Sequence, residues 1–188
     1  MKHLASFCLL TLIAIPVFAR DTMYISVTSA FKVKATMDSF TGKAVSDTLE
    51  VKGDEKLVLV VFKIADMETG KKDRDKAMKK MFFADQYPLI TGTADMDAIL
   101  ALDPAAESAE LPVDVVMHGI AKPVIGKVSK VTKTDTVTSF DLAFPVDLKE
   151  YELKPPSIMM MIRVSGIVNV TSHVTVSTQP PAATGSSK

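Results

Sequence analysis

The sequence has almost no cysteine, and this absence limits its chemistry. The single cysteine among 188 residues is Cys8, which lies inside an apolar N-terminal segment. If that segment is removed, the remaining chain has neither disulfides nor thiols, even in a compartment that permits disulfides. We therefore expect neither cysteine catalysis nor a disulfide framework.

The chain also lacks an excess of charge of either sign. Its 22 basic and 22 acidic side chains balance, and no basic block interrupts the sequence. A neutral chain of this kind has nothing with which to attract a phosphate backbone, so nucleic acid is excluded as a partner.

Metal ligands and catalytic motifs are equally scarce. Of the three histidines, His3 lies in the N-terminal segment, which leaves His118 and His173. A protein zinc site usually needs three or four ligands, so we expect no metal. The sequence contains no nucleophile elbow, phosphate loop, dinucleotide fingerprint or HExxH motif, and we expect no cofactor. An enzymatic interpretation rests only on His118 with the nearby Asp114; a binding protein is favoured.

Residues 1–19 have the layout of a secretory signal peptide. Lys2 is followed by a largely apolar run over 4–18, and residues 17–19 (VFA) offer a cleavage site after Ala19. The run of about 15 residues is shorter than the roughly 20 that span a bilayer, although an uncleaved anchor is the alternative. We therefore expect a periplasmic or secreted protein. Downstream, no second run of 18 apolar residues occurs, and residues 178–188 have the composition of a disordered tail.

Residues 20–177 have the pattern of one β-rich domain. Alternating or densely β-branched segments occur at 24–36, 56–64, 111–120, 124–131, 139–148 and 157–176. Residues 121–123 are short enough for a hairpin connection, and most other connections are too short for parallel crossovers. The sequence predicts an antiparallel barrel or sandwich of about seven or eight strands.

One segment departs from the β pattern. Residues 70–81 are charged and rich in helix formers, which predicts a short inserted helix covering a barrel end or edge. A weaker helical patch covers 104–110. The lysines of the first helix form a basic stripe that either meets anionic lipid headgroups transiently or is simply solvated: Lys71, Lys72, Lys76, Lys79 and Lys80.

Two predicted strands are apolar on both faces. Residues 57–62 and 158–162 carry apolar side chains at both parities, so both faces are expected to avoid water. An apolar lumen, a helix packed outside, or a subunit interface would each satisfy that pattern. The consecutive residues 159–161 (MMM) favour a lumen that adapts to a flexible ligand, while filling of a packed core is the plainer alternative.

Short stretches of the sequence resemble motifs of the YceI-like family. These are residues 73–75 (DRD), 81–83 (MFF), 87–88 (YP) and 90–91 (IT), followed by 117–124 (MHGIAKPV), which is similar to an HG(V/I)xxPV signature. The resemblance extends from about Phe31 to Val176. It implies an all-β, lipocalin-like antiparallel barrel of about eight strands in the periplasm, with a long apolar pocket. Members of the family are associated with polyisoprenoids and other long-chain lipids or amides, and some are dimers.

The candidate ligand-binding residues follow from these patterns. Phe82 and Phe83 are adjacent and point in different directions, so one is expected to plug the barrel end and the other to line the pocket. Arg74 either contacts a polar ligand head or forms a solvated ion pair with Asp75; His118 either contacts the head or stabilises a turn. The apolar candidates are Phe62, Met81, Phe82, Phe83, Met117, Phe140, Leu142, Phe144, Met159 and Met161.

Two functions fit the sequence. The first is a periplasmic or secreted protein that holds a long-chain lipid or isoprenoid in the barrel lumen. The alternative is a structural or interaction module of the cell envelope, in which apolar strand faces form a homodimer or partner interface.

Overall fold

The computed structural model describes residues 22–36, 39–52, 55–155, 157–158 and 162–180, and the side chains of all these except 157–158 and 162–163. The predicted signal peptide, Met159 and Met161 lie outside the described residues. In chain order the elements are β1 (Met23–Ala35), β2 (Ser39–Val45), β3 (Leu49–Val51), β4 (Leu57–Lys63), η1 (Ile64–Asp66), α1 (Lys72–Met81), β5 (Leu89–Asp95), α2 (Met96–Leu100), β6 (Ala109–Met117), β7 (Ile120–Lys133), β8 (Val137–Asp147), η2 (Leu148–Tyr151), β9 (Ser157–Ile158) and β10 (Ile162–Ser177).

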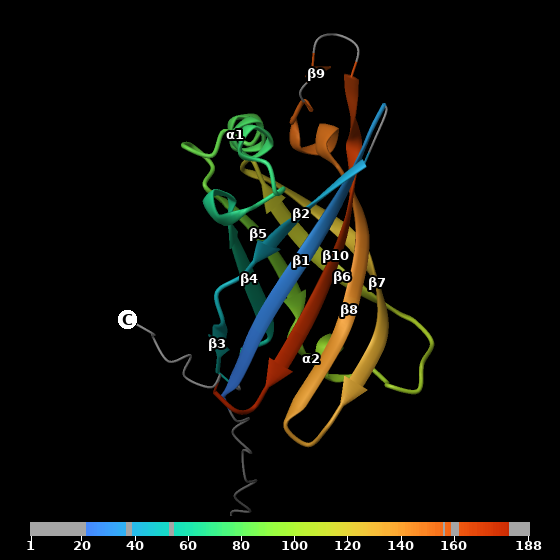
Figure 1. The fold of residues 1–188 in the computed structure, drawn as a ribbon. Coiled ribbons are helices and arrows are strands. Elements are labelled where there is room, and N and C mark those ends of the chain that lie inside the picture. Colours follow the sequence, from blue (N-terminus) through green and yellow to red (C-terminus); the bar gives the residue numbers. More distant parts are fainter. Residues whose placement is uncertain (1–21, 37–38, 53–54, 156, 159–161, 181–188) are drawn as a thin grey trace, which may run out of the picture.

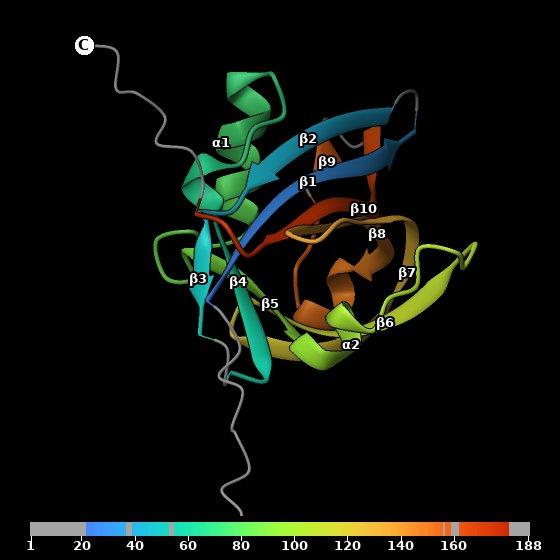
Figure 2. The same ribbon diagram turned by 90° about the horizontal axis from the view of Figure 1, so that it is seen from below.

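The strands form one curled antiparallel sheet. Eight of them follow the order β2-β1-β10-β8-β7-β6-β5-β4, while the short β3 pairs with β1 and β9 with β10. Figures 1 and 2 show these strands surrounding an interior. The 16-residue β10 pairs with β1 on one side and β8 on the other, so it lies inside the sheet rather than at either end. The predicted antiparallel barrel of about eight strands is confirmed.

The two ends of the sheet meet along a seam between β2 and β4. Within the described chain no ladder joins these strands; instead, Lys43 of β2 exchanges two backbone hydrogen bonds with Glu68, of 2.7 and 3.0 Å. An exposed ion pair of 2.7 Å between Lys63 and Asp47 also crosses the seam. The barrel is therefore closed by few contacts at this point.

Helices α1 and α2 lie towards opposite ends of the barrel (Figure 1). Helix α1 matches the predicted inserted helix over 70–81, starting two residues later because Gly70 has a positive φ of 75°. The predicted helical patch at 104–110 is wrong. The side chain of Asp103 accepts a hydrogen bond from the backbone N–H of Ala105, which is typical of a turn, and β6 begins at Ala109.

The hairpin between β6 and β7 turns earlier than expected. Residues 121–123 were the predicted connection, but the turn consists of His118 and Gly119, both at positive φ (53° and 74°). Two such residues are what a type I′ hairpin turn requires. Pro123 lies inside β7, where it is tolerated because β8 pairs with β7 only from Lys127 onwards.

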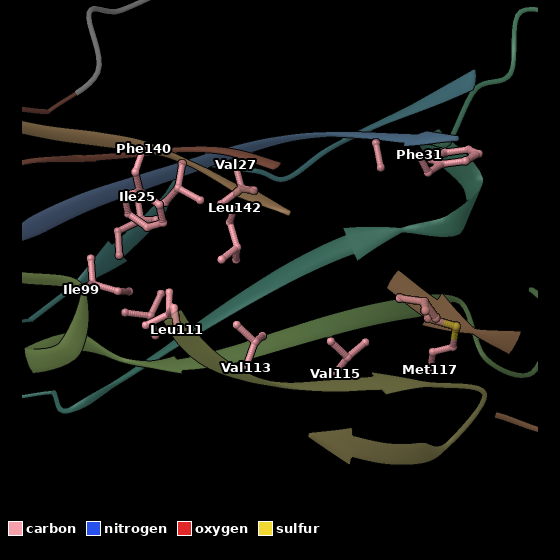
Figure 3. Close-up of a cluster of buried hydrophobic side chains, with 14 of the residues drawn as sticks. Ile25, Val27, Phe31, Ile99, Leu111, Val113, Val115, Met117, Phe140 and Leu142 are labelled. Atoms are coloured by element: carbon pink, nitrogen blue, oxygen red, sulfur yellow. The ribbon is translucent and has the colours of Figure 1, made fainter. Parts of the chain in front are cut away.

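The strands alternate between interior and solvent. On β1, the residues from Met23 to Val33 are buried at every second position, and β6 and β8 follow the same rule. Figure 3 shows apolar side chains directed toward one another from facing strands: Ile25, Val27, Phe140 and Leu142 on one side, and Leu111, Val113, Val115 and Met117 on the other.

The doubly apolar β4 is covered on one face only. Val58 is buried and Val60 and Phe62 are half-buried on the inner face, while Leu57 and Leu59 are 58% and 47% exposed on the outer face. The expectation that both faces avoid water is therefore wrong for this strand in the single chain.

Candidate functional site

The barrel encloses a cavity of about 470 Å³. This volume falls within the range of about 300–1,000 Å³ that is typical of small-molecule pockets. Side chains from β1, β2, β4, β5, β6, β8 and β10 form its wall, and α1 and α2 contribute at the ends. The cavity therefore occupies the interior that the alternation of the strands creates.

The wall of the cavity is overwhelmingly apolar. The inner-face residues of the strands supply most of it, including the row of four residues on β6, Leu111, Val113, Val115 and Met117. Four methionines of the described part of the chain contribute flexible thioethers, which suit a cavity whose occupant has many conformations: Met67, Met78, Met81 and Met117.

Most of the residues predicted from the sequence lie in this wall. They come from β4, α1 and the residue after it, β6 and β8, and the barrel brings them together around one space: Phe62, Arg74, Met81, Phe82, Met117, Phe140, Leu142 and Phe144. Their contact with a ligand stays a prediction. Met159 and Met161 lie outside the described residues.

Phe83 and His118 lie outside the cavity wall. Phe83 has a φ of 51°, which turns the chain away from α1, and its side chain is 51% exposed. Its ring stacks on His118 at 5.2 Å, and Tyr87 contacts the same imidazole edge-on at 4.6 Å. The Nδ1 atom of His118 is 2.9 Å from the Tyr151 carbonyl oxygen and donates to it. His118 thus ties the β6–β7 turn to η2, which corresponds to the structural alternative.

The enzymatic interpretation gains no geometric support. Asp114 is exposed on the outer face of β6, and within the described chain the hydrogen bond of His118 goes to Tyr151 instead. Among the described residues, no group of three or more histidine, cysteine, aspartate or glutamate side chains is arranged to hold a metal ion.

A pair of buried serines interrupts the apolar wall. Ser29 of β1 and Ser172 of β10 are directly opposite each other in the ladder, and both line the cavity. Their hydroxyl oxygens are 2.7 Å apart, so one donates to the other. The pair satisfies much of its own hydrogen-bonding capacity within an apolar environment.

A second polar group lies where α1 meets the cavity. The Nη2 atom of Arg74 donates to the Thr69 carbonyl oxygen at 2.6 Å, and its Nε atom donates to Thr69 Oγ1 at 3.3 Å. The guanidinium carbon lies 4.7 Å from the centre of the Phe40 ring. Thr69, Arg74 and Phe40 all line the cavity, as does Asp73. The Arg74 guanidinium is therefore held in place at the cavity wall.

The carboxylate of Asp75 belongs to the same group. It accepts hydrogen bonds from Thr69 Oγ1 (2.5 Å) and from the Thr69 backbone N–H (2.7 Å). The bond from the Thr69 hydroxyl is the main cause that holds the Asp75 pKa below its ordinary value. The alternative of an Arg74–Asp75 ion pair is not what the structure shows: both side chains bind Thr69 rather than each other.

Sequence reasoning missed much of the wall. The inner row of β1, the β4 residues Val58 and Val60, and Ile99 of α2 all line the cavity. The alternation of apolar and polar residues on β1 and β6 predicts that each strand has one buried face, but it does not show which face lines a cavity. That choice is made by the closure of the sheet and by α1 and α2 at its ends.

A polar cluster outside the cavity lies on the outer face of the sheet. Asp141 of β8 accepts from Lys130 (2.8 Å) and lies 2.9 Å from His173 Nδ1. These two hydrogen bonds, led by that of Lys130, hold the Asp141 pKa below its ordinary value. Both partners are largely exposed, so the cluster is a surface feature.

None of the helices in the described chain is long and apolar enough to cross a membrane.

A curled antiparallel sheet around an apolar cavity defines the class of small β-barrel proteins with an internal pocket. The sequence matches the YceI-like domain family over residues 18–179, and the chain belongs to that family. The predicted resemblance is thereby confirmed. No curated protein is significantly similar in sequence.

Solved structures show the same fold. A polyisoprenoid binding domain from Saccharophagus degradans, implicated in plant cell wall breakdown, superposes with a TM-score of 0.64 at 15% identity, covering 82% of this chain and 97% of that one. BcnA of Burkholderia cenocepacia superposes with a TM-score of 0.59 at 14% identity, covering 79% and 95%. At these identities the likeness establishes the fold alone.

Proposed function

We propose that this protein binds one long-chain apolar molecule, a polyisoprenoid or a fatty-acid-like lipid, inside the barrel. The observation that carries the proposal is the cavity of about 470 Å³ with an almost wholly apolar wall. The polyisoprenoid-binding function named for the Saccharophagus domain supports the same ligand class. We further propose that the protein works in the periplasm or is secreted, on the basis of its signal-like residues 1–19.

The hydrophobic effect is sufficient to drive such binding. Each buried methylene contributes on the order of 0.8 kcal/mol, so a chain of some 20 methylenes gives a gross gain of about 16 kcal/mol. Ordering the ligand and the side chains around it offsets much of this gain. Tight binding with little dependence on the detailed structure of the chain is expected.

Gly92 offers a substitution that narrows the cavity without disturbing the wall. It lines the cavity on β5, and a Cβ atom built there meets only the Val113 side chain, at 3.6 Å, which is ordinary contact. Gly92→Leu should therefore occupy ligand space. It should also stabilise the empty protein, because it adds apolar contacts and removes a strand glycine.

The experiment is native mass spectrometry of protein produced in a bacterial periplasm, followed by organic extraction of the bound molecule. We expect a discrete added mass in the wild type and in Thr93→Leu, a matched control because Thr93 is the next residue on β5 and is absent from the cavity wall. Gly92→Leu should carry that mass in a much smaller fraction of molecules while melting at an equal or higher temperature. If the wild type carries no added mass and also fails to take up geranylgeraniol or palmitate, the proposal is refuted.

A second candidate function is an interaction module. The exposed Leu57 and Leu59 on the outer face of β4 favour it, since β4 is also an end strand of the sheet. The same mass spectra distinguish it: an unloaded protein that appears as a dimer would support this function instead.

A further inference from the structure

The cavity reaches the protein surface beside α1. Among the lining residues whose side chains the structure describes, Asp73 and Ala77 are exposed to solvent, and the others are buried or half-buried. Asp73, Ala77 and the half-buried Met81 are spaced by four residues, so they form one row along α1. This row borders the cavity and is open to solvent over part of its length, so the mouth of the cavity lies along α1.

A row of lysines runs along α1 next to this mouth. Lys72, Lys76 and Lys80 are also spaced by four residues, and each directly precedes a member of the cavity-lining row. Successive residues of an α-helix are separated by about 100° around its axis, so the two rows lie on adjoining faces. All three lysines are exposed, and none belongs to the salt bridges of the described chain. Three ammonium groups thus lie in solvent beside the mouth of the cavity.

The two ends of the barrel differ in charge, although the whole chain is neutral. Residues 71–85, which contain α1, carry six basic and three acidic side chains. Residues 95–110, which contain α2 towards the opposite end, carry five acidic side chains and no lysine or arginine (Figure 1). Lys133 offsets part of that negative charge, since it reaches this end and donates to the Leu100 carbonyl oxygen. A molecule with this charge distribution turns its α1 end toward a negatively charged surface.

An exposed aromatic ring lies at the same end. Phe83 follows α1 by two residues, and its side chain is 51% exposed although the ring stacks on His118. Lysines on the polar face of a helix and an exposed phenylalanine are the features by which proteins contact a membrane surface: the lysines meet anionic head groups and the ring enters the interface. The combination favours a lipid bilayer over an acidic protein as the partner of this end.

We propose that the α1 end of the barrel docks on an anionic lipid bilayer, with Lys72, Lys76 and Lys80 against the head groups and the cavity mouth facing the membrane. The proposal rests on the proposed lipid-binding function and adds the partner with which the ligand is exchanged. Direct passage between bilayer and cavity keeps the apolar chain of the ligand out of water, where its exposure is unfavourable. The acidic α2 end points away from the membrane in this arrangement.

The first test measures binding to vesicles by sedimentation. Wild-type protein is mixed with vesicles of phosphatidylcholine and phosphatidylglycerol, or with vesicles of phosphatidylcholine alone. We expect binding to the anionic vesicles that weakens as salt is added, because salt screens exposed charges. Since each lysine near an anionic membrane strengthens binding by about fivefold, the Lys72→Gln/Lys76→Gln/Lys80→Gln variant should bind at least about tenfold more weakly.

The matched control removes the same number of charges outside the α1 end. Lys52, Lys56 and Lys127 are exposed, and Lys56 lies beside the start of α2, where its carbonyl oxygen accepts from the Met96 backbone N–H. The Lys52→Gln/Lys56→Gln/Lys127→Gln variant should bind the anionic vesicles as the wild type does. Phe83→Ser removes the exposed ring and no charge, and it should weaken binding at every salt concentration.

The second test follows the ligand. The rate at which radiolabelled geranylgeraniol passes from anionic vesicles to the protein is measured for the wild type and both lysine variants. The Kd of each protein for geranylgeraniol is measured separately, by titration from a cyclodextrin carrier. The variant of the α1 lysines should take up the ligand from vesicles more slowly, in proportion to its loss of membrane binding, while its Kd stays that of the wild type.

Four outcomes would overturn the docking. They are equal binding of the wild type to both kinds of vesicle, equal losses in the two lysine variants, binding to polyglutamate but not to anionic vesicles, which would indicate an acidic protein partner, and an unchanged rate of ligand transfer in a variant that no longer binds the membrane. If the wild type binds anionic vesicles but takes no geranylgeraniol from cyclodextrin, the proposed function fails while the docking stands.

Discussion

At the scale of single residues, the serine pair in the cavity wall is an unexpected element of an apolar surface. Ser29 and Ser172 are about as buried as their apolar neighbours on β1 and β10. A hydroxyl in such a place is tolerated because each serine supplies a partner for the other at 2.7 Å. Removing one partner leaves the other unsatisfied, whereas removing both restores a uniform apolar wall.

This asymmetry gives a prediction for lipid-free protein. Ser29→Ala and Ser172→Ala should each lower the free energy of unfolding by about 1 kcal/mol, and the double variant should be close to the wild type. Urea denaturation of the four proteins measures the difference, provided that the slope with urea stays constant. A coupling energy below about 0.5 kcal/mol would show that the hydroxyls act independently and would contradict the pairing.

At the scale of elements, the seam between β2 and β4 is the place where the barrel is held by few interactions. The Lys43–Glu68 bridge joins the two ends of the sheet there. Gly42, one residue before the bridge, lies opposite Phe31 on β1, and the Phe31 ring covers it. A Cβ atom on Gly42 would lie 2.1 Å from Phe31 Cζ and 2.6 Å from the Glu68 carbonyl oxygen. The glycine is therefore needed for the close approach of three segments.

Gly42→Ala should consequently open the seam. Overpacking of this kind costs about 1–3 kcal/mol, and we expect faster hydrogen exchange at the backbone amides of Lys43 and Glu68. The control is Gly166→Ala on β10, where the nearest atom would be Asp147 Oδ1 at an ordinary 3.6 Å. That variant should be neutral or slightly more stable. Unchanged exchange at Lys43 in Gly42→Ala would mean that the Phe31 ring moves aside freely.

At the scale of the whole molecule, the fold was readable from the sequence because alternation is a local property. Each long strand carries its own period of two, and the charged helix α1 is distinct from it. The existence of the cavity was harder to predict from the sequence. Whether Phe140 and Leu142 fill a core or line a space depends on the distance across the barrel, which no local pattern encodes. The position of Phe83 was missed because a single positive φ after α1 reverses its direction.

The exposure of Leu57 and Leu59 also could not be predicted from the local pattern. The sequence of β4 showed that both of its faces are apolar, but it showed neither that β4 is an end strand of the sheet nor that its outer face is open to solvent. The turn at His118–Gly119 begins three residues before the predicted connection at 121–123. Its place is set by the positive φ angles of His118 and Gly119 and by the β6–β7 register, in which Met117 lies opposite Ile120.

Because the cavity lies within the folded barrel, its occupant should stabilise the whole molecule. A ligand that binds only the native state, at a free concentration of 100 times its Kd, adds about 2.7 kcal/mol. For a domain of this size, each kcal/mol raises the melting temperature by about 2–4 °C, so geranylgeraniol should raise it by roughly 5–11 °C. The shift should grow with the logarithm of ligand concentration. Gly92→Leu, whose added side chain occupies part of the cavity, should show a much smaller shift at each concentration, and differential scanning calorimetry of both proteins measures this. An equal shift in the two proteins would place the ligand outside the barrel.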